Sequence, residues 1–125
     1  SINENIPLLA YSPLARGLLT GKYQNSNIPF NSRLSRDGQN LLNEIINDRS
    51  LKAVDAYIKL AKEFSLNPIH MSLSFCAKRP FMGSVIFGAT SIIQLREILN
   101  GINLKLSDEI LEKINLINKQ FPLTF

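Results

Sequence analysis

Residues 9–23 read Leu9-Ala10-Tyr11-Ser12-Pro13-Leu14-Ala15-Arg16-Gly17-Leu18-Leu19-Thr20-Gly21-Lys22-Tyr23. An apolar run that begins at Ile6 ends at Tyr11, which predicts a buried strand over residues 6–11. A turn with proline, glycine and small residues follows, and Arg16 and Lys22 bring two cations close to it. Small residues allow the backbone to approach a bulky ligand closely. The stretch therefore predicts a ligand-binding loop at the end of a strand.

Composition limits the classes of partner. The chain of 125 residues has a formal net charge of +4, and its cations are scattered among acids. A nucleic-acid-binding protein usually shows a basic stripe, so no nucleic-acid partner is expected. No run approaches the roughly 20 apolar residues of a membrane span, so no membrane partner is expected either. The single Cys76 and single His70 cannot form a disulfide or a metal site, and we expect a cytoplasmic protein without metal.

The remaining elements are predicted as helices and one further strand. A short strand over residues 84–87 ends at Gly88. Helices are predicted from the N-cap Asp48 to about residue 64, from Asn67-Pro68 to Lys78, from Ser91 to near Gly101, and from Ser107 onward. Residues 12–47 are predicted to form a long loop with at most a helical turn or two over 41–46.

Strands that are separated by helices pair in parallel, because the connection between them is a long crossover. Both predicted strands end in a glycine-containing turn, and ligands bind at the carboxyl ends of parallel strands. Two strands form neither a closed barrel nor a stable open sheet. We therefore expect the chain to be a piece of a longer protein that supplies the rest of the sheet.

Two blocks in this order resemble the aldo-keto reductases, in particular a bacterial branch similar to potassium-channel β subunits. Residues 11–23 resemble the loop after the seventh strand of that family's barrel, and residues 85–95 resemble the eighth strand and the start of its helix. Residues 71–75, Arg79-Pro80 and Leu106-Ser107 are similar to intervening and closing parts. The resemblance implies an α/β fold in which residues 1–125 are a single partial domain, the C-terminal portion of a (β/α)₈ TIM barrel (strands 7 and 8 with their helices).

The resemblance also implies NADP(H) as cofactor and a set of residues that bind it. Tyr11 takes the position that stacks on the nicotinamide; the alternative is a core tyrosine that closes the barrel mouth. The turn around the pyrophosphate would be formed by Ser12, Pro13, Leu14 and Gly17, with Lys22 as a contacting cation. An ordinary turn with surface charge is the alternative reading, and we assign Arg16 and Arg36 to surface charge.

The adenosine end is matched by Arg33, Gly88, Thr90, Gln94 and Glu97. Gln94 has an equally good explanation as the partner of Ser91 in a capping box. The sequence departs from the family at two positions. Gly88 stands where many members have lysine or arginine, and Ile98 stands where an asparagine usually contacts adenine, which weakens the expectation of NADP over NAD.

No catalytic residue is predicted in this chain, since the family's Tyr, Lys, Asp and His come from earlier strands and loops. Tyr23 belongs to the cofactor loop and Tyr57 to a helix stripe, while His70 is expected to cap or pack. We expect the cofactor-binding part of an oxidoreductase that reduces a carbonyl substrate by hydride transfer and needs the missing N-terminal barrel part to turn over. The alternatives are a non-catalytic nucleotide-binding or interaction module and an inactive remnant of a truncated gene.

Overall fold

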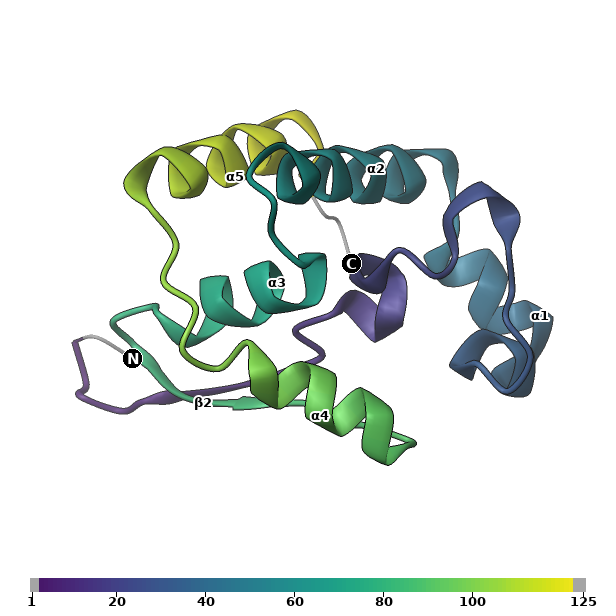
Figure 1. The fold of residues 1–125 in the computed structure, drawn as a ribbon, viewed down its shortest axis with the longest axis horizontal. Coiled ribbons are helices and arrows are strands. Elements are labelled where there is room, and N and C mark those ends of the chain that lie inside the picture. The colour runs from purple at the N-terminus through teal and green to yellow at the C-terminus, as the bar shows by residue number, and fades with distance from the viewer. Residues whose placement is uncertain (1–2, 123–125) are drawn as a thin grey trace.

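The computed structural model describes residues 3–122, without the side chains of residues 26, 37, 39, 41–43 and 45. Strands and helices follow one another as an α/β fold (Figure 1). In chain order, with η for a 3₁₀ helix, the elements are β1 (Leu8–Tyr11), η1 (Ala15–Thr20), η2 (Gln24–Ser26), α1 (Arg33–Ile45), α2 (Asp48–Glu63), α3 (Pro68–Ala77), β2 (Met82–Ile86), α4 (Ile92–Asn100) and α5 (Asp108–Gln120).

The strands β1 and β2 form a two-stranded parallel sheet, as the sequence predicts. Leu8 lies opposite Met82 and Tyr11 lies opposite Ile86, with one irregularity between Leu8 and Leu9. Strand β1 begins two residues later than predicted, because Pro7 has no N–H group to donate to a ladder. Strand β2 covers residues 82–86 where 84–87 were predicted, so glycine at position 83 did not prevent strand formation.

The two faces of the sheet differ in cover. Helix α3 packs on one face of the sheet (Figure 1). Ala10 and Val85 lie opposite each other in register and are both partly buried, which assigns them to this covered face. Side chains alternate along a strand, so the next residues in register lie on the opposite face. On that face Leu9, Tyr11 and Ile86 are 62, 81 and 51% exposed. One face of the sheet is thus apolar and open, and the prediction of a buried strand over residues 6–11 is wrong for Leu9 and Tyr11, because only one face of the sheet is covered by a helix in the described part of the chain.

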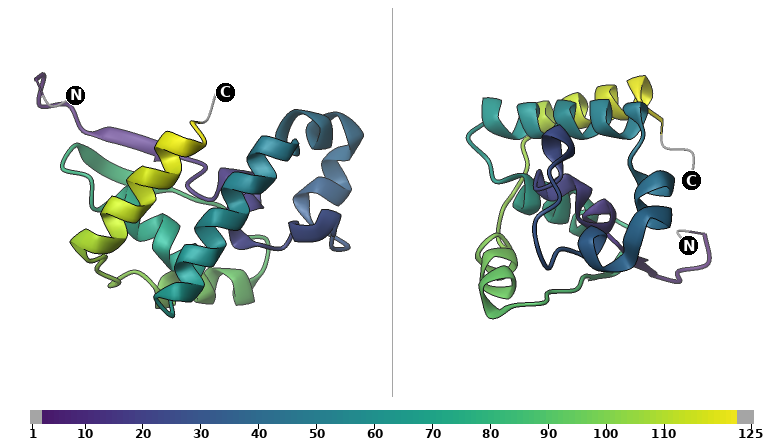
Figure 2. Two further views of the ribbon diagram at one scale, coloured as in Figure 1. Left: turned by 90° about the horizontal axis from the view of Figure 1, so that it is seen from above. Right: turned by 90° about the vertical axis from the view of Figure 1, so that its right-hand side faces the viewer.

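Helices α2 and α5 run side by side above α3, as both views in Figure 2 show. Buried residues from these three helices form one cluster, made of Leu60, Ala61, Met71, Ile110 and Ile114. We call it the helix cluster. Helix α3 lies between the α2–α5 layer and the sheet, and it is therefore the central element of the fold (Figure 1).

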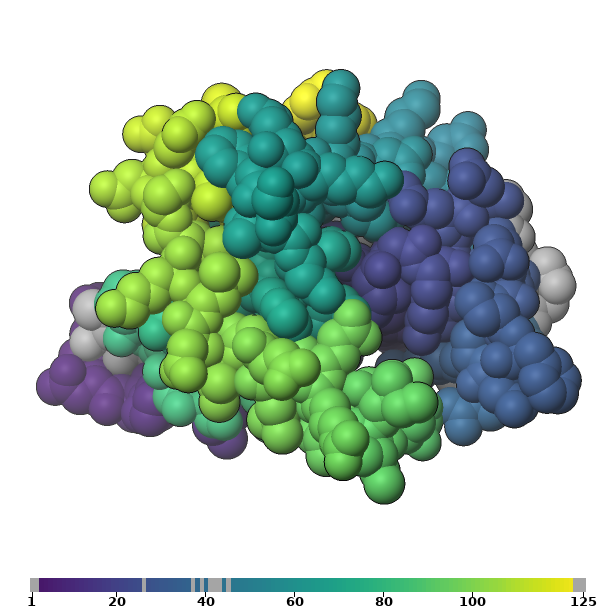
Figure 3. All heavy atoms as spheres, in the orientation of Figure 1, coloured from purple at the N-terminus to yellow at the C-terminus, as the bar shows by residue number. Residues whose placement is uncertain are grey.

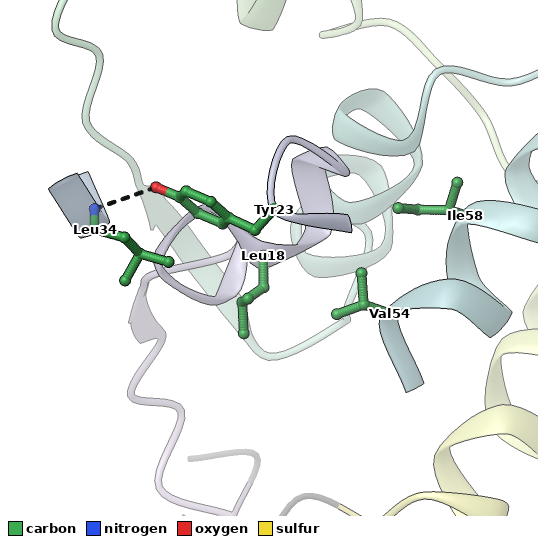
Figure 4. Close-up of a cluster of buried hydrophobic side chains, with 5 residues drawn as sticks. All are labelled: Leu18, Tyr23, Leu34, Val54 and Ile58. Atoms are coloured by element: carbon green, nitrogen blue, oxygen red, sulfur yellow. Dashed lines mark hydrogen bonds between the residues drawn. The ribbon is translucent and has the colours of Figure 1, made fainter. Parts of the chain in front are cut away.

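A second group of buried residues ties the segment after β1 to helix α2. This loop cluster contains Leu18, Tyr23, Leu34, Val54 and Ile58 (Figure 4). The hydroxyl of the buried Tyr23 accepts a hydrogen bond from the backbone N–H of Leu34 at 3.5 Å. The segment that sequence alone assigns to a loop therefore has a core of its own.

The prediction of a long loop over residues 12–47 is wrong for much of that range. Two 3₁₀ segments and the helix α1 occupy it, and α1 is far longer than the turn or two expected. Gly38 interrupts α1 with φ +81° and ψ −176°, which explains why no continuous helical pattern is visible in the sequence. Glycine in this backbone region is close to obligatory.

The helix starts follow the sequence signals with one correction. Asn47, not Asp48, caps α2: its Oδ1 accepts from the Ser50 N–H at 2.9 Å, and the Ser50 hydroxyl oxygen accepts from the Asn47 N–H at 3.0 Å. Asp48 instead lies in the first turn. The predicted caps Asn67, Ser91 and Ser107 are confirmed. Over residues 3–122, none of these helices combines the length and apolar character that a membrane span needs.

Candidate functional site

The parallel register brings two distant loops to one edge of the sheet. Tyr11 and Ile86 are the last paired residues of their strands and lie opposite each other. The loop after Tyr11 and the loop of residues 87–91 therefore leave the sheet at the same, carboxyl edge. This is the edge at which parallel α/β structures bind ligands. Tyr11 presents its ring there with most of its surface accessible.

The backbone of the first loop is unusual. Ser12, Ala15 and Arg16 have φ values of +57°, +48° and +57°, and Gly17 follows with +97°. A left-handed backbone costs a non-glycine residue roughly 1–2 kcal/mol. Such outliers gather at ligand clamps, where successive N–H groups can face an anion. The loop thus holds a costly shape that an ordinary connection does not need.

Three hydrogen bonds hold this shape. The Thr20 hydroxyl donates to the Gly17 carbonyl at 2.7 Å, and the Gln24 side-chain amide donates to Asp55 of α2 at 2.7 Å. The third is the bond between Tyr23 and Leu34 at the start of α1, drawn as the dashed line in Figure 4. The loop is therefore fixed to both neighbouring helices.

Lys22 and Gly17 lie against each other within the loop. A Cβ atom on Gly17 would lie 3.2 Å from Lys22 Cε and 3.4 Å from its Nζ. The Lys22 ammonium also lies 5.0 Å from the centroid of the Tyr23 ring, within cation–π range. The cation is therefore held beside the left-handed turn, where it can face an anionic ligand.

The second loop ends at the first turn of α4. The Ser91 hydroxyl oxygen accepts from the Gln94 N–H at 3.2 Å, as an N-cap does. The predicted capping box is incomplete, however, because Gln94 Oε1 accepts from the N–H and the hydroxyl of Thr90 at 2.9 and 3.0 Å. Thr90 and Gln94 are thus joined to each other. A Cβ on Gly88 would meet no atom within 4 Å, so the space beside it is open.

Glu97 lies one turn further along α4 and faces α3. Its Oε1 accepts a hydrogen bond from the Asn67 side-chain amide at 3.1 Å, and its carbonyl oxygen lies 2.5 Å from His70 Nε2. His70 therefore packs between helices, as expected of it. Neither this contact nor the one between Gln24 and Asp55 has a sequence signal, because each joins residues far apart in the chain. Only the N-cap position of Asn67 could be read in advance.

Comparison with known proteins agrees with this architecture. A model of the aldo/keto reductase family matches residues 2–119. The chain belongs to the aldo/keto reductase family. The protein tas from Escherichia coli K12 is 34% identical over 118 residues, which are 94% of this chain and 34% of that protein. A probable voltage-gated potassium channel subunit beta from Oryza sativa subsp. japonica is 34% identical over 118 residues, covering 92% of this chain and 36% of that protein.

A solved structure supports the fold. The glycerol dehydrogenase from Gluconobacter oxydans superposes with a TM-score of 0.72 over 97% of this chain and 36% of its own, at 21% identity. The chain spans about a third of the length of the curated relatives reported above. The predicted likeness to the channel-β branch of the aldo/keto reductases is thus confirmed.

Within the aldo/keto reductase frame, the predicted site residues fall into groups. Tyr11 ends β1, and Ser12, Pro13, Leu14, Gly17 and Lys22 follow it in the first loop. Gly88 and Thr90 belong to the second loop, and Gln94 lies in the first turn of α4, bonded to Thr90. Arg33 is the exposed first residue of α1, next to the Leu34 N–H that binds Tyr23. Glu97 stands apart from the α4 N-terminus and contacts α3. The structure thus places all but Arg33 and Glu97 on the two loops or on the strand end and helix start that adjoin them.

The tyrosines besides Tyr11 are poorly placed for proton transfer. Tyr23 is 1% exposed, and burial raises the pKa of the half-buried Tyr57 above its ordinary value. A general acid must reach its substrate and works best with a pKa near the working pH, so the burial of Tyr23 and the raised pKa of Tyr57 are each unfavourable for that role. Among residues 3–122, no group of three or more His, Cys, Asp and Glu side chains is gathered as a metal site would require.

The two loops suit a phosphorylated, flat ligand. Tyr11 offers an exposed aromatic face, Lys22 a cation, and the first turn of α4 its N–H groups, which have no partner within a helix. In the described residues no atom would lie within 4 Å of a Cβ on Gly88, so the second loop leaves open space beside it. These features fit a nicotinamide dinucleotide, the kind of cofactor that the family generally uses.

Proposed function

We propose that this chain is the C-terminal, NADP(H)-binding part of an aldo/keto reductase that reduces a carbonyl substrate by hydride transfer. One observation carries the proposal above all: the register of Tyr11 opposite Ile86 brings the two family-like blocks to one edge of a parallel sheet. The blocks are separated in the sequence by helices α1, α2 and α3, yet both provide loops to the same edge.

Each part of the cofactor can be assigned to residues at or near this edge of the sheet. Tyr11 would cover one face of the nicotinamide, and Lys22 with the turn at Gly17 would bind the pyrophosphate. The first turn of α4 would receive the adenosine phosphate, with Thr90 and Gln94 beside it. Arg33 and Glu97 are assigned to the adenosine end. When bound, the reduced nicotinamide supplies the hydride.

The proton donor of the reduction is proposed to lie outside residues 1–125. Support comes from the burial of Tyr23 and from the raised pKa of Tyr57, which make both hydroxyls weak candidates. The chain's own contribution is to bind and orient the cofactor. The identity of the carbonyl compound would be set largely by barrel loops, of which this chain provides only the later ones.

The remaining part of the barrel is the proposed partner of the open sheet face. Leu9, Tyr11 and Ile86 offer that face an apolar surface, and both sheet edges lack a neighbouring strand among the described residues. Helix α4, green at the lower front of Figure 3, has exposed apolar residues of its own, Ile92 and Ile93, which are 70 and 79% exposed. Burying such a surface would stabilise the assembled protein, because each large side chain contributes roughly 1.5–3 kcal/mol.

A second candidate function is a nucleotide-binding or interaction module without turnover. The relative from Oryza sativa is named as a probable potassium channel subunit, which favours a regulatory role in part of the family. Both candidates share the cofactor edge and differ in whether a carbonyl is reduced.

The test is a titration of the purified protein with NADPH, followed by nicotinamide fluorescence. Wild type is compared with Lys22→Ala and Arg33→Ala, which should each weaken binding by about 1–3 kcal/mol. Lys119→Ala, on the exposed surface of α5, is the matched control and should leave the affinity unchanged.

The same titration separates the candidates. Binding by residues 1–125 alone, without carbonyl reduction after the N-terminal barrel part is added, favours the module. Turnover that appears only with that part favours the reductase. An absence of NADPH binding in both forms contradicts the proposed function and leaves the third expectation, an inactive remnant.

A further inference from the structure

Two residues at the start of α3 make polar contacts with Glu97 of α4. The Asn67 side-chain amide donates to Glu97 Oε1 at 3.1 Å, and His70 Nε2 lies 2.5 Å from the Glu97 carbonyl oxygen. We infer that Asn67 and His70 are positioning residues that fix the Glu97 carboxylate for the adenine end of the cofactor. The inference rests on the proposed function and adds two residues that the sequence comparison does not assign to the site.

Asn67 is oriented by two hydrogen bonds of opposite sense. Its Oδ1 accepts from the Ile69 N–H at 2.8 Å as the N-cap of α3, so its Nδ2 must point away from that turn. Nδ2 then reaches Glu97 Oε1, in a partly buried contact. The cap therefore determines which end of the amide faces α4. A donor at this place holds the Glu97 carboxylate in one rotamer.

The Glu97 carboxylate retains capacity for a ligand. In residues 3–122 no side chain donates to its second oxygen, Oε2. A carboxylate only accepts hydrogen bonds, so the ligand group must be a donor. The exocyclic amino group of a purine base is such a donor, and the proposed adenosine site begins one turn away on the same helix.

His70 fixes the backbone of Glu97 in the same way. Its ring fills the space beside the buried Gly101, where an added Cβ would lie 2.2 Å from His70 Cγ. The ring therefore cannot move toward α4, and α4 cannot rotate about its axis without losing the contact at the Glu97 carbonyl. Side chain and backbone of Glu97 are thus both held by α3.

The test compares ligands that represent the two halves of the cofactor in the full-length protein. Adenosine 2′,5′-bisphosphate represents the adenosine half, and reduced nicotinamide mononucleotide represents the other. The main variant is Asn67→Ser, since serine still caps α3 but cannot donate to Glu97 across the same distance. Asn118→Ser, on the exposed surface of α5, is the matched control.

For Asn67→Ser we expect about a tenfold loss of affinity for the adenosine half, as for one hydrogen bond to a charged group. The affinity for the nicotinamide half and the melting temperature should stay within error of the control. Equal losses for both halves, or a lower melting temperature with unchanged adenosine affinity, would mean a structural role and overturn the inference.

A second pair of variants keeps the inference testable if serine disturbs the helix start. Asn67→Asp retains the cap but places a second carboxylate beside that of Glu97. The repulsion between the two carboxylates should weaken adenosine binding further. Adding Glu97→Gln restores the hydrogen bond with its direction reversed and leaves an acceptor oxygen on residue 97, so affinity should recover. Failure to recover would overturn the positioning role. If the wild-type protein binds neither half, the proposed function itself fails, and the positioning role fails with it.

Discussion

Tyr11 and Ile86 lie opposite each other as the last paired residues of two parallel strands. This single register contact sets where the two loops of the candidate site begin. It also leaves Tyr11 exposed on the uncovered face of the sheet, at the edge where the loops diverge. The geometry of the site therefore depends on a pairing between two strands that are separated in the sequence by helices α1, α2 and α3.

The contact between Gly17 and Lys22 predicts that a methyl group would disturb cofactor binding. Gly17→Ala adds a Cβ at 3.2 Å from Lys22 Cε in a residue with φ +97°. Gly38→Ala also strains a positive φ, +81°, but its Cβ meets nothing within 4 Å. Each variant should lose about 1–3 kcal/mol of unfolding free energy in urea. Only Gly17→Ala should weaken NADPH binding, and equal effects of both variants on the affinity would contradict the role of Lys22.

The open space beside Gly88 predicts a change in cofactor preference. Gly88→Lys is expected to bring a cation to the proposed adenosine phosphate site, since no atom of the described residues would lie within 4 Å of a Cβ at this position. The ratio of NADPH to NADH affinity should rise about tenfold, as for one charge-assisted contact of about 1.4 kcal/mol. Dissociation constants for both cofactors measure it. Ala89→Lys, one residue away, is the control, and a parallel change for both cofactors would exclude a contact with the 2′-phosphate.

The packing of His70 on Gly101 predicts a large loss of stability for Gly101→Ala. The new Cβ would lie 2.2 Å from His70 Cγ and 2.7 Å from its Cβ, so one helix must shift. Overpacking of this kind costs about 3 kcal/mol, whereas Gly88→Ala, in open space, should stay within about 0.5 kcal/mol. Chemical denaturation measures both. Combining Gly101→Ala with His70→Ala should restore part of the loss; strict additivity would show that the two residues do not interact.

Cys76 predicts a pH-dependent reaction with thiol reagents. Burial raises the pKa of its thiol, and the nearby Arg79 only partly offsets this change. The thiolate is the reactive form, so iodoacetamide should label the folded protein more slowly than the urea-unfolded chain at pH 8.5. It is the only cysteine, which makes the label unambiguous. Equal rates would show an unprotected thiol.

The sign of the stability effect follows from the same shift. Because the pKa of Cys76 is higher in the folded state, the unfolded chain loses its proton first as the pH rises. The contribution of the neutral thiol is fully present below the pKa of the unfolded chain, and it is lost as the pH rises through the folded-state value. In urea titrations at pH 7 and above, the unfolding free energy of wild type should therefore fall relative to that of Cys76→Ser as the pH rises.

Elements with a local signal were predictable from sequence. The caps Asn67, Ser91 and Ser107 stand directly before apolar helical patterns, and both strands are short apolar runs that end in turn residues. The predicted cap Asp48 was wrong by one residue, since Asn47 and Asp48 are both good caps and only the bond with Ser50 distinguishes them.

Elements that depend on distant contacts were not predictable. Helix α1 escaped detection because Gly38 breaks its pattern, and its first turn is fixed by the hydroxyl of Tyr23. The contacts of Asp55 with Gln24 and of Asn67 with Glu97 join polar residues that ordinarily lie in solvent. The family-like motifs located most of the candidate site, but its supporting contacts are set by tertiary packing.

The pairing of Leu8 with Met82 has a consequence for the order of folding. Closing so long a segment of chain carries an entropy cost before any ladder hydrogen bond forms, so contacts of this kind develop late. Helices α2, α3 and α5 can assemble around their shared cluster first. The carboxyl edge of the sheet would then be the last part of the molecule to become structured. A dinucleotide that touches both loops would therefore lower the unfolding rate and leave the folding rate nearly unchanged.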